Sequence, residues 1–331
     1  MYKQESSKIA QIDAVIAWVD GNDPKQREKI EKYADKKILK ANDVAGPTRF
    51  NSVGEIYYCV ASILRFAPFI QNIFIVTDDQ NPGLDDMVET YFPGRKENIK
   101  IIDHKIIFKG LEESLPTFSS MSIETCLHKI PELSENFVYF NDDFFLVRPV
   151  HPNDWFVEDK VKAYGTWRLK PLDELVSMVK PRKGGLKPIG YKDTLIQGAK
   201  ALNYFWKYFH FEHTPHPLKK SVLNQIYSDH PDLFVRNTAF KFRHADQFNP
   251  QELYYLYMFR NNKALKNKPE FLYIKPEGRG KGYIKRKMDA FEKNKGIKFA
   301  CIGSLDNASQ NDRNVLLNWL SNLLDLNLAE L

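Results

Sequence analysis

Two acidic side chains stand side by side in an otherwise aromatic stretch, Phe140-Asn141-Asp142-Asp143-Phe144. Burying an ionised carboxylate is costly unless it is paired or binds a cation. Oxygen ligands suit Mg²⁺ or Mn²⁺, especially beside a nucleotide diphosphate. Because neighbouring residues of a strand point to opposite faces, one carboxylate could face a site while the other braces it. The pair predicts a metal site at Asp142 and Asp143; the alternative is a strand-end turn.

A second polar group, Trp18-Val19-Asp20-Gly21-Asn22-Asp23-Pro24, follows the first apolar run of the chain. In open α/β sheets, ligands bind outside the carboxyl ends of the strands. Asp20 and Asp23 suit a metal or a ribose, Gly21 allows close backbone approach, and Trp18 offers a surface for a base. The alternative is a strand-to-helix turn whose Asp and Asn side chains satisfy backbone donors.

Histidine and arginine are the next candidates for chemistry. In His213-Thr214-Pro215-His216-Pro217 the prolines restrict the backbone between two imidazoles, each able to act as a general base or to bind a metal. The alternative is a helix start with Pro217 in its first turn. Arg243 could hold phosphoryl oxygens in its planar fork, or make only a surface salt bridge.

A basic run between Lys275 and Lys287 contains Gly278-Arg279-Gly280-Lys281-Gly282. Repeated glycines with basic side chains can bind phosphate, so Arg279, Lys281 and Lys285 are candidates for contacting an anionic polymer. The spacing matches neither a P-loop nor a dinucleotide fingerprint. A solvated loop is the alternative.

Composition bounds the class of protein. The 331 residues are 43% hydrophobic, 13% aromatic and 27% charged, which excludes a disordered chain, a collagen and a small disulfide scaffold. A net charge of +6 favours anionic partners. Three widely spaced cysteines predict neither a disulfide framework nor a zinc site, and favour a reducing, cytoplasmic setting. No apolar run is long enough to span a bilayer, so we expect at most peripheral contact with the inner membrane.

Short apolar runs alternate with helical patterns in the first 150 residues. We expect strands at Ile12–Val19, Asn72–Thr77, Ile99–Ile107 and Phe137–Val147, the last interrupted by Asn141-Asp142-Asp143. We expect helices at Glu55–Arg65 and Ser122–Lys129. This alternation predicts an α/β fold with a mostly parallel sheet and helices on both faces.

From His151 the pattern becomes helical and basic. We expect helices at Ala199–Phe209, Pro217–Tyr227 and Pro250–Asn261, then strands at Phe271–Ile274 and Lys298–Ile302, and a final helix at Arg313–Leu324 capped within Asn311-Asp312. The expected parts are residues 1–150, a helical lobe over 151–270, and a returning α/β segment over 271–331.

Taken together and in order, these segments resemble the stealth family, whose members include bacterial capsule polymerases and the catalytic part of a lysosomal-enzyme N-acetylglucosamine-1-phosphotransferase. The matching segments are Ile12–Gly21, Arg49-Phe50-Asn51 with Gly54-Glu55-Ile56, Ile73–Gln80, Leu115–Ser120 with Glu124, His128–Pro131, Asn141–Asp143, His213–Pro217 and Arg243-His244.

The resemblance implies a GT-A or Rossmann-like nucleotide-sugar fold and transfer of a hexose-1-phosphate. An acceptor hydroxyl would attack the β-phosphorus of a UDP-sugar, and UMP would leave. The similarity is greatest to polymerases of poly(N-acetylglucosamine-1-phosphate), which implies UDP-GlcNAc as donor, an anionic capsular polysaccharide as acceptor, contacts with other capsule-synthesis proteins, and no nucleic acid.

The same resemblance implies roles for residues. The first 150 residues would bind the donor, and the lobe over 151–270 would bind the acceptor. His213 or His216 would act as base, with Arg243 and Asp142 also catalytic and Mg²⁺ or Mn²⁺ at Asp142 and Asp143. The donor-pocket residues would be Trp18, Asp20, Gly21, Arg49, Asn51 and Glu55.

Two other functions fit parts of the sequence. A conventional metal-dependent glycosyltransferase would use the same carboxylates but release UDP. A basic module without activity would bind polyanionic polysaccharide through Lys180–Lys187 and Lys275–Lys287.

Overall fold

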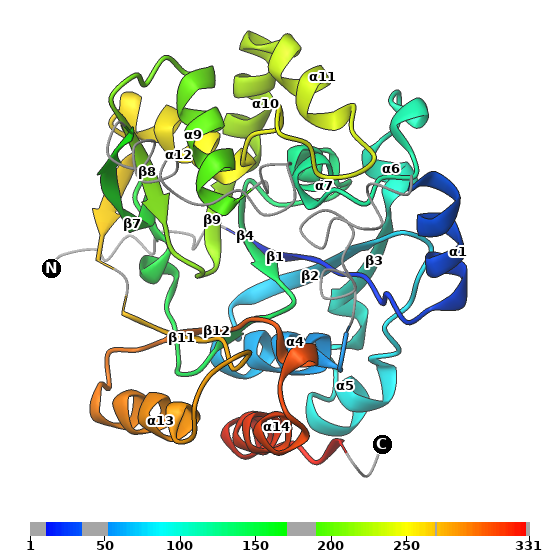
Figure 1. Cartoon of the computed structure of the whole chain (residues 1–331), viewed down its shortest axis with the longest axis vertical. Helices are drawn as coiled ribbons and strands as arrows, with labels where there is room; N and C mark the ends of the chain where they lie inside the picture. The colour runs from blue at the N-terminus through cyan, green and yellow to red at the C-terminus, as the bar shows by residue number, and fades with distance from the viewer. Residues whose placement is uncertain (1–10, 35–51, 171–189, 269, 329–331) are drawn as a thin grey trace, which may run out of the picture.

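The computed structural model describes residues 11–34, 52–170, 190–268 and 270–328. Its central sheet has the strand order β3-β2-β1-β4-β9 (Figure 1). The strands are β1 (Ile12–Ala17), β2 (Ile70–Thr77), β3 (Ile99–Asp103), β4 (Asn136–Asn141) and β9 (His216–Lys219). The first four run parallel, and β9 pairs antiparallel with β4 at the edge. The expected mostly parallel α/β sheet is confirmed.

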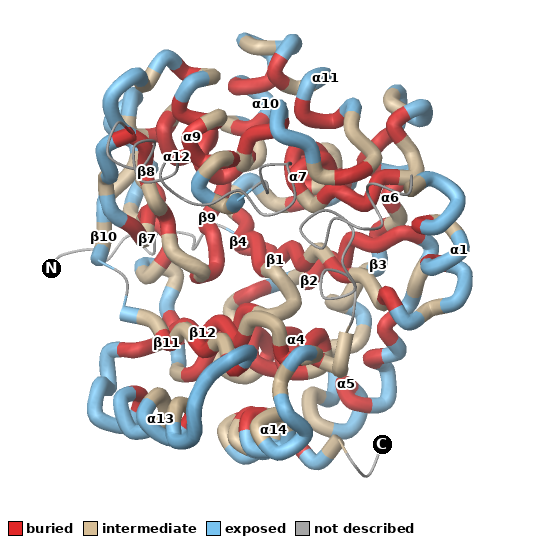
Figure 2. The backbone as a smooth tube through the Cα atoms, in the orientation of Figure 1, coloured by how far each residue is buried: buried red, intermediate tan, exposed pale blue. Residues whose placement is uncertain are grey.

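Helices cover both faces of this sheet (Figure 1). On one side lie α4 (Glu55–Phe66), α5 (Asp85–Tyr91) and α14 (Gln310–Leu324), and on the other lie α6 (His104–Ile107), α7 (Ser120–Thr125), α10 (Lys220–Asp229) and α11 (Pro231–Thr238). Helix α1 (Pro24–Tyr33) lies beyond β3. Residues Ile12 to Ile16 of β1 are all buried, as in a strand covered on both faces (Figure 2). The one carboxylate among them, Asp13, accepts hydrogen bonds from the Asn72 N–H at 3.0 Å and the Ser134 N–H at 2.8 Å.

The lobe after residue 150 contains a sheet as well as helices. Its strands are β6 (Phe156–Val157), β7 (Lys160–Leu169), β8 (Lys207–Phe211) and β10 (Ala264–Asn267), packed against α9 (Tyr191–Ala201) and α12 (Pro250–Arg260). The helix expected over 199–209 is wrong, because the chain leaves α9 at Ala201 and pairs with β7. Gly165 permits this pairing, since a Cβ there would lie 2.5 Å from the His210 carbonyl oxygen.

Two other boundaries differ from expectation for local reasons. The helix expected from Pro217 begins at Lys220, since Pro217 lies in β9, an edge strand where a missing N–H is tolerated. The strand expected to reach Ile107 ends at Asp103, whose side chain accepts a hydrogen bond from the Lys105 N–H and caps α6.

A third, smaller sheet joins β11 (Phe271–Ile274), β12 (Phe299–Ile302) and β5 (Phe144–Leu146), with α13 (Tyr283–Lys293) beside it. The two expected strands here are confirmed, whereas α14 is capped by Ser309 and not within Asn311-Asp312. Because β4 belongs to the central sheet and β5 to this one, Asp142 and Asp143 lie where the chain crosses between sheets. Short 3₁₀ turns occupy Lys96–Asn98, Glu112–Ser114, Leu127–Lys129, Pro152–Asp154 and Leu305–Asn307.

One continuous hydrophobic core runs through the sheets and their covering helices. Tyr254 and Tyr255 of α12 are buried in it. Among the helices of the described residues, none has the length and apolarity to cross a bilayer.

Candidate active site

The central sheet has a topological switch point between β1 and β4. From β1 the chain adds β2 and β3 on one side and then returns to add β4 on the other, so Ala17 pairs with Asn141 at the carboxyl ends. Crevices at such points are where open α/β sheets bind ligands. A pocket of about 340 Å³ lies here, and each parallel strand sends the residue after its end into the lining: Trp18, Asp78, His104 and Asp142.

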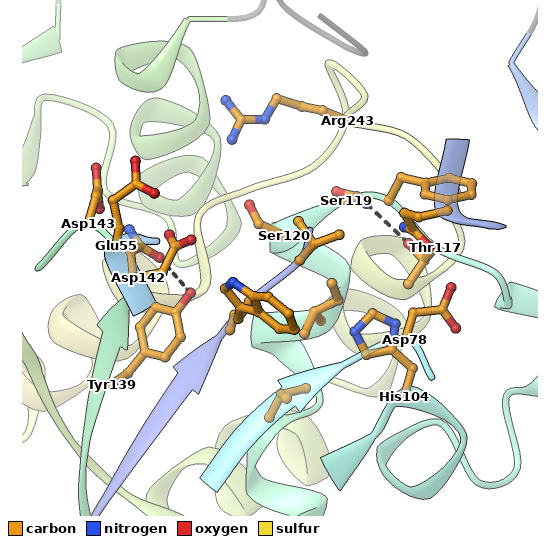
Figure 3. A pocket seen from close by; sticks show the side chains of 18 of the residues that line it. Glu55, Asp78, His104, Thr117, Ser119, Ser120, Tyr139, Asp142, Asp143 and Arg243 are labelled. Carbon is orange, nitrogen blue, oxygen red and sulfur yellow. Dashed lines mark hydrogen bonds between the residues drawn. The ribbon is translucent and has the colours of Figure 1, made fainter. Parts of the chain in front are cut away.

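The acidic end of the pocket holds Glu55, Asp142 and Asp143 (Figure 3). Burial raises the pKa of Asp142 well above its usual range, and repulsion from Asp143 and Glu55 adds to this. Burial also raises the pKa of Asp143 to about 7, with Glu55 contributing. The Glu55 carboxylate is held at the start of α4 by the Val53 N–H at 2.7 Å, and burial raises its pKa too. Among the described residues that line this end of the pocket, none is a Lys or Arg, and Arg243 lies on another side.

This donor set fits a divalent cation. All the candidate ligands are carboxylate oxygens, and a cation would relieve the repulsion that raises their pKa values. Within the described residues no three His, Cys, Asp or Glu side chains form a complete metal-ligand group. Mg²⁺ is usually bound by one or two carboxylates together with substrate phosphates and water, so Asp142 and Asp143 suit an ion completed by a phosphate ligand.

Arg243 reaches the pocket from the loop before α12, away from the carboxylates (Figure 3). Two of its side chains, Phe242 and Gln247, hold this loop. Phe242 stacks on Phe118 with ring centroids 4.9 Å apart. The buried Gln247 amide accepts from Ser119 Oγ at 2.9 Å and donates to the Asn237 carbonyl oxygen at 2.8 Å. The loop thus fixes a guanidinium over the same cavity as the acidic pair.

Glu124 of α7 lies behind the pocket wall. Its Oε1 accepts a hydrogen bond from Tyr139 Oη at 3.2 Å, and Tyr139 Oη also lies 2.8 Å from Asn141 Oδ1. Burial raises the pKa of Glu124 to about 7, although the charge of Arg243 opposes the shift. The motif resemblance includes Glu124, but our site prediction omitted it.

Neither expected histidine lines the pocket. His216 is 4% exposed, its Nδ1 lies 3.2 Å from Tyr255 Oη, and burial lowers its pKa to about 3. His213 is half-buried and stacks on Tyr273, with ring centroids 5.2 Å apart. The Tyr273 hydroxyl and the Asp143 carboxylate both lie near Gly303. The Tyr273 ring therefore lies between His213 and the acidic end of the pocket. Burial lowers the pKa of His213, which keeps it neutral.

The other predicted residues fall into four groups. Trp18 and Glu55 line the pocket, whereas Asp20 and Gly21 lie in the turn after β1, where Asp20 Oδ1 accepts from the Asn22 N–H at 2.8 Å. Asp23 caps α1. Outside the described residues lie Arg49, Asn51 and the segment Lys180–Lys187. Residues exposed at or before α13, away from the pocket lining, are Arg279, Lys281 and Lys285.

Asp78 and His104 were missed as site residues. Each directly follows a parallel strand, β2 and β3, so the rule that selected Trp18 could have selected them. Because the sequence predicted a strand that continued to Ile107, it did not predict that β3 ends at Asp103 and that His104 follows its carboxyl end.

Comparison with known proteins agrees with this architecture. Residues 49–164 match the profile described as Stealth protein CR2, conserved region 2. The capsular polysaccharide phosphotransferase WcwK of Streptococcus pneumoniae is 32% identical over 263 residues, which cover 72% of this chain and 75% of WcwK. This chain belongs to the Stealth family. It is an enzyme, a phosphotransferase, and the resemblance drawn from its motifs is confirmed at the level of the family.

Another relative of this Stealth enzyme is the capsular polysaccharide phosphotransferase cps12A of Actinobacillus pleuropneumoniae, 39% identical over 223 residues that cover 64% of this chain and 54% of cps12A. Among solved structures, the galactosyltransferase LgtC with donor and acceptor sugar analogues aligns over 95% of each chain, with 11% identity and a TM-score of 0.47.

Proposed function

We propose that this Stealth enzyme transfers N-acetylglucosamine-1-phosphate from UDP-GlcNAc to a hydroxyl of a growing capsular polysaccharide and releases UMP, in the cytoplasm. The observation that carries the proposal is the pocket at the switch point, where Asp142 and Asp143 line one end and Arg243 reaches in from another side. The printed names of the relatives, capsular polysaccharide phosphotransferases, support a sugar-phosphate transfer.

In the proposed step, the acceptor oxygen forms a bond to the β-phosphorus, and the bond from that phosphorus to the bridging oxygen of the diphosphate breaks. The electron pair leaves with UMP, and the sugar C1–O bond stays intact. Phosphoryl transfer of this kind depends mainly on positioning and charge stabilisation. Asp142 and Asp143 would hold Mg²⁺, which when bound neutralises the diphosphate and the leaving UMP. Arg243 would place its guanidinium on the phosphoryl oxygens.

The released nucleotide tests this function. We expect purified enzyme, supplied with UDP-GlcNAc and a phosphorylated GlcNAc oligomer, to release UMP in step with acceptor consumption, as measured by liquid chromatography. UDP as the stoichiometric product would refute the proposal and support a conventional glycosyltransferase. A parallel reaction without acceptor controls for hydrolysis of the donor.

We propose His213 as the base that takes the proton from the acceptor hydroxyl. It stacks on Tyr273, whose hydroxyl lies near the acidic end, and its lowered pKa leaves the imidazole unprotonated and able to accept a proton. We expect His213→Ala to lower kcat by about 10²-fold or more, the usual contribution of a general base. His216→Ala should mainly lower the midpoint of thermal unfolding, because His216 packs in the core.

Steady-state kinetics of both variants, after circular dichroism confirms folding, distinguish these roles. If both histidine variants keep near-parental kcat, the proton acceptor is instead a pocket carboxylate. Asp143 would then be the candidate, because it lines the pocket and burial raises its pKa to about 7.

A further inference from the structure

The pocket has a second polar end that the proposed chemistry leaves unused. Asp78 and His104, which follow β2 and β3, lie together on the side away from Asp142 and Asp143 (Figure 3). Ring-bearing residues Trp18 and Phe118 line the same cavity. A ligand whose diphosphate lay at the acidic end would place its remaining parts toward Asp78 and His104.

His104 carries an unused hydrogen-bonding atom at this end. The residue is 5% exposed, and among the described residues no group bonds its buried Nδ1. Burial lowers its pKa to about 4, so the ring is neutral near pH 7 and has one N–H donor and one bare nitrogen. Buried polar atoms in folded proteins are nearly always hydrogen-bonded, so an unpartnered one on a pocket wall points to a ligand.

Asp78 differs from the carboxylates at the acidic end because its charge is already compensated. Its Oδ2 lies 3.0 Å from Lys29 Nζ of α1, and its side chain is 11% exposed. This ion pair holds the carboxylate in place as a hydrogen-bond acceptor. The end formed by Asp78 and His104 therefore suits a neutral polar group more than a metal or a phosphate.

We propose that Asp78 and His104 recognise the uracil base of the donor. Uracil presents an N3–H donor between two carbonyl acceptors. The Asp78 carboxylate would accept from N3–H, and the neutral His104 ring would donate to a neighbouring carbonyl. Cytosine has a bare N3 that would face the Asp78 carboxylate, acceptor against acceptor, so this pair of residues selects uracil over cytosine.

The inference rests on the proposed function in one respect only, that the donor is a uridine nucleotide. It is tested by isothermal titration calorimetry of the full chain with UMP and with CMP. We expect wild-type enzyme to bind UMP at least about tenfold tighter than CMP. Asp78→Asn should lose that preference, since an amide can donate to the bare N3 of cytosine, and His104→Ala should weaken UMP binding severalfold. The exposed Asp289→Asn of α13 is the matched control and should keep the wild-type ratio.

The ratio of the two affinities separates recognition from folding, because general damage would weaken both nucleotides together. Equal binding of UMP and CMP by wild-type enzyme, or a wild-type ratio in folded Asp78→Asn, would overturn the inference. If Asp78→Asn does not fold, unchanged UMP binding by His104→Ala would overturn it in the same way. Release of UDP in the product assay would reject the proposed reaction while leaving the preference for uracil intact, so the two failures are distinguishable.

Discussion

Asp142→Asn and Asp143→Asn are each expected to lower kcat by about 10²–10³-fold, the loss typical when a group that stabilises transition-state charge is removed. EDTA should abolish turnover by wild-type enzyme, and added Mg²⁺ should restore it. The physical reason is that these carboxylates are the proposed oxygen ligands of the metal ion. Among the described residues that line the acidic end with them, none is a Lys or Arg that would compensate their charge.

The same variants should fold at least as well as the wild type. Because the folded-state pKa values of Asp142 and Asp143 are raised, the charged forms oppose folding at neutral pH, and this cost disappears as pH falls through those values. Asn removes the charge, so we expect an unchanged or higher midpoint of thermal unfolding without metal. Mg²⁺ with UMP should raise the wild-type midpoint but not that of the variants.

Asp289→Asn, an exposed substitution in α13, is the control for these measurements and should retain wild-type kcat. Full activity in EDTA, or in both pocket variants, would contradict the metal assignment. A lower unfolding midpoint in both variants would instead show that the acidic pair has a structural role.

Arg243→Ala is expected to have the other large effect, lowering kcat by about 10³-fold, as when an arginine that stabilises a transferring phosphoryl group is lost. Arg243→Lys should recover little of it, because an ammonium cannot reproduce the planar fork. UMP affinity should change by only a few-fold, since Arg243 would act on the transferred group. The loop is held by Phe242 and Gln247, so the substitution should not disturb it.

Single-turnover kinetics and calorimetry with UMP separate these effects. Arg286→Ala, which removes an exposed arginine of α13, is the matched control and should behave as wild type. A kcat for Arg243→Ala within threefold of wild type would remove Arg243 from the proposed mechanism, and a large loss of UMP affinity would move it to donor binding.

Local patterns predicted much of the fold. Apolar runs marked β1, β2, β11 and β12, and helical periodicity marked α4, because each signal lies within a few consecutive residues. The helix expected over 199–209 is wrong because the spacing of the aromatic residues there fits the period of a strand as well as that of a helix. Pairing with β7, a strand some forty residues earlier in the chain, decided that Lys207–Phe211 forms β8.

Residue chemistry likewise identified part of the candidate site. An adjacent pair of carboxylates in an aromatic strand is costly without a partner, so the sequence by itself singled out Asp142 and Asp143, and family motifs added Arg243. Their placement around one cavity required the crossing from β4 to β5 and the loop held by Gln247, which join segments about a hundred residues apart.

Only the tertiary structure decided which motif residues reach the pocket. It brought Asp78 and His104 to the lining, set Glu124 behind it, and buried His216 against Tyr255. Sequence determines which side chains can accept a proton, bind a cation or read a base. Which of them share a cavity depends on the order and register of paired strands, and those are set by hydrogen bonds and packing between segments far apart in the chain.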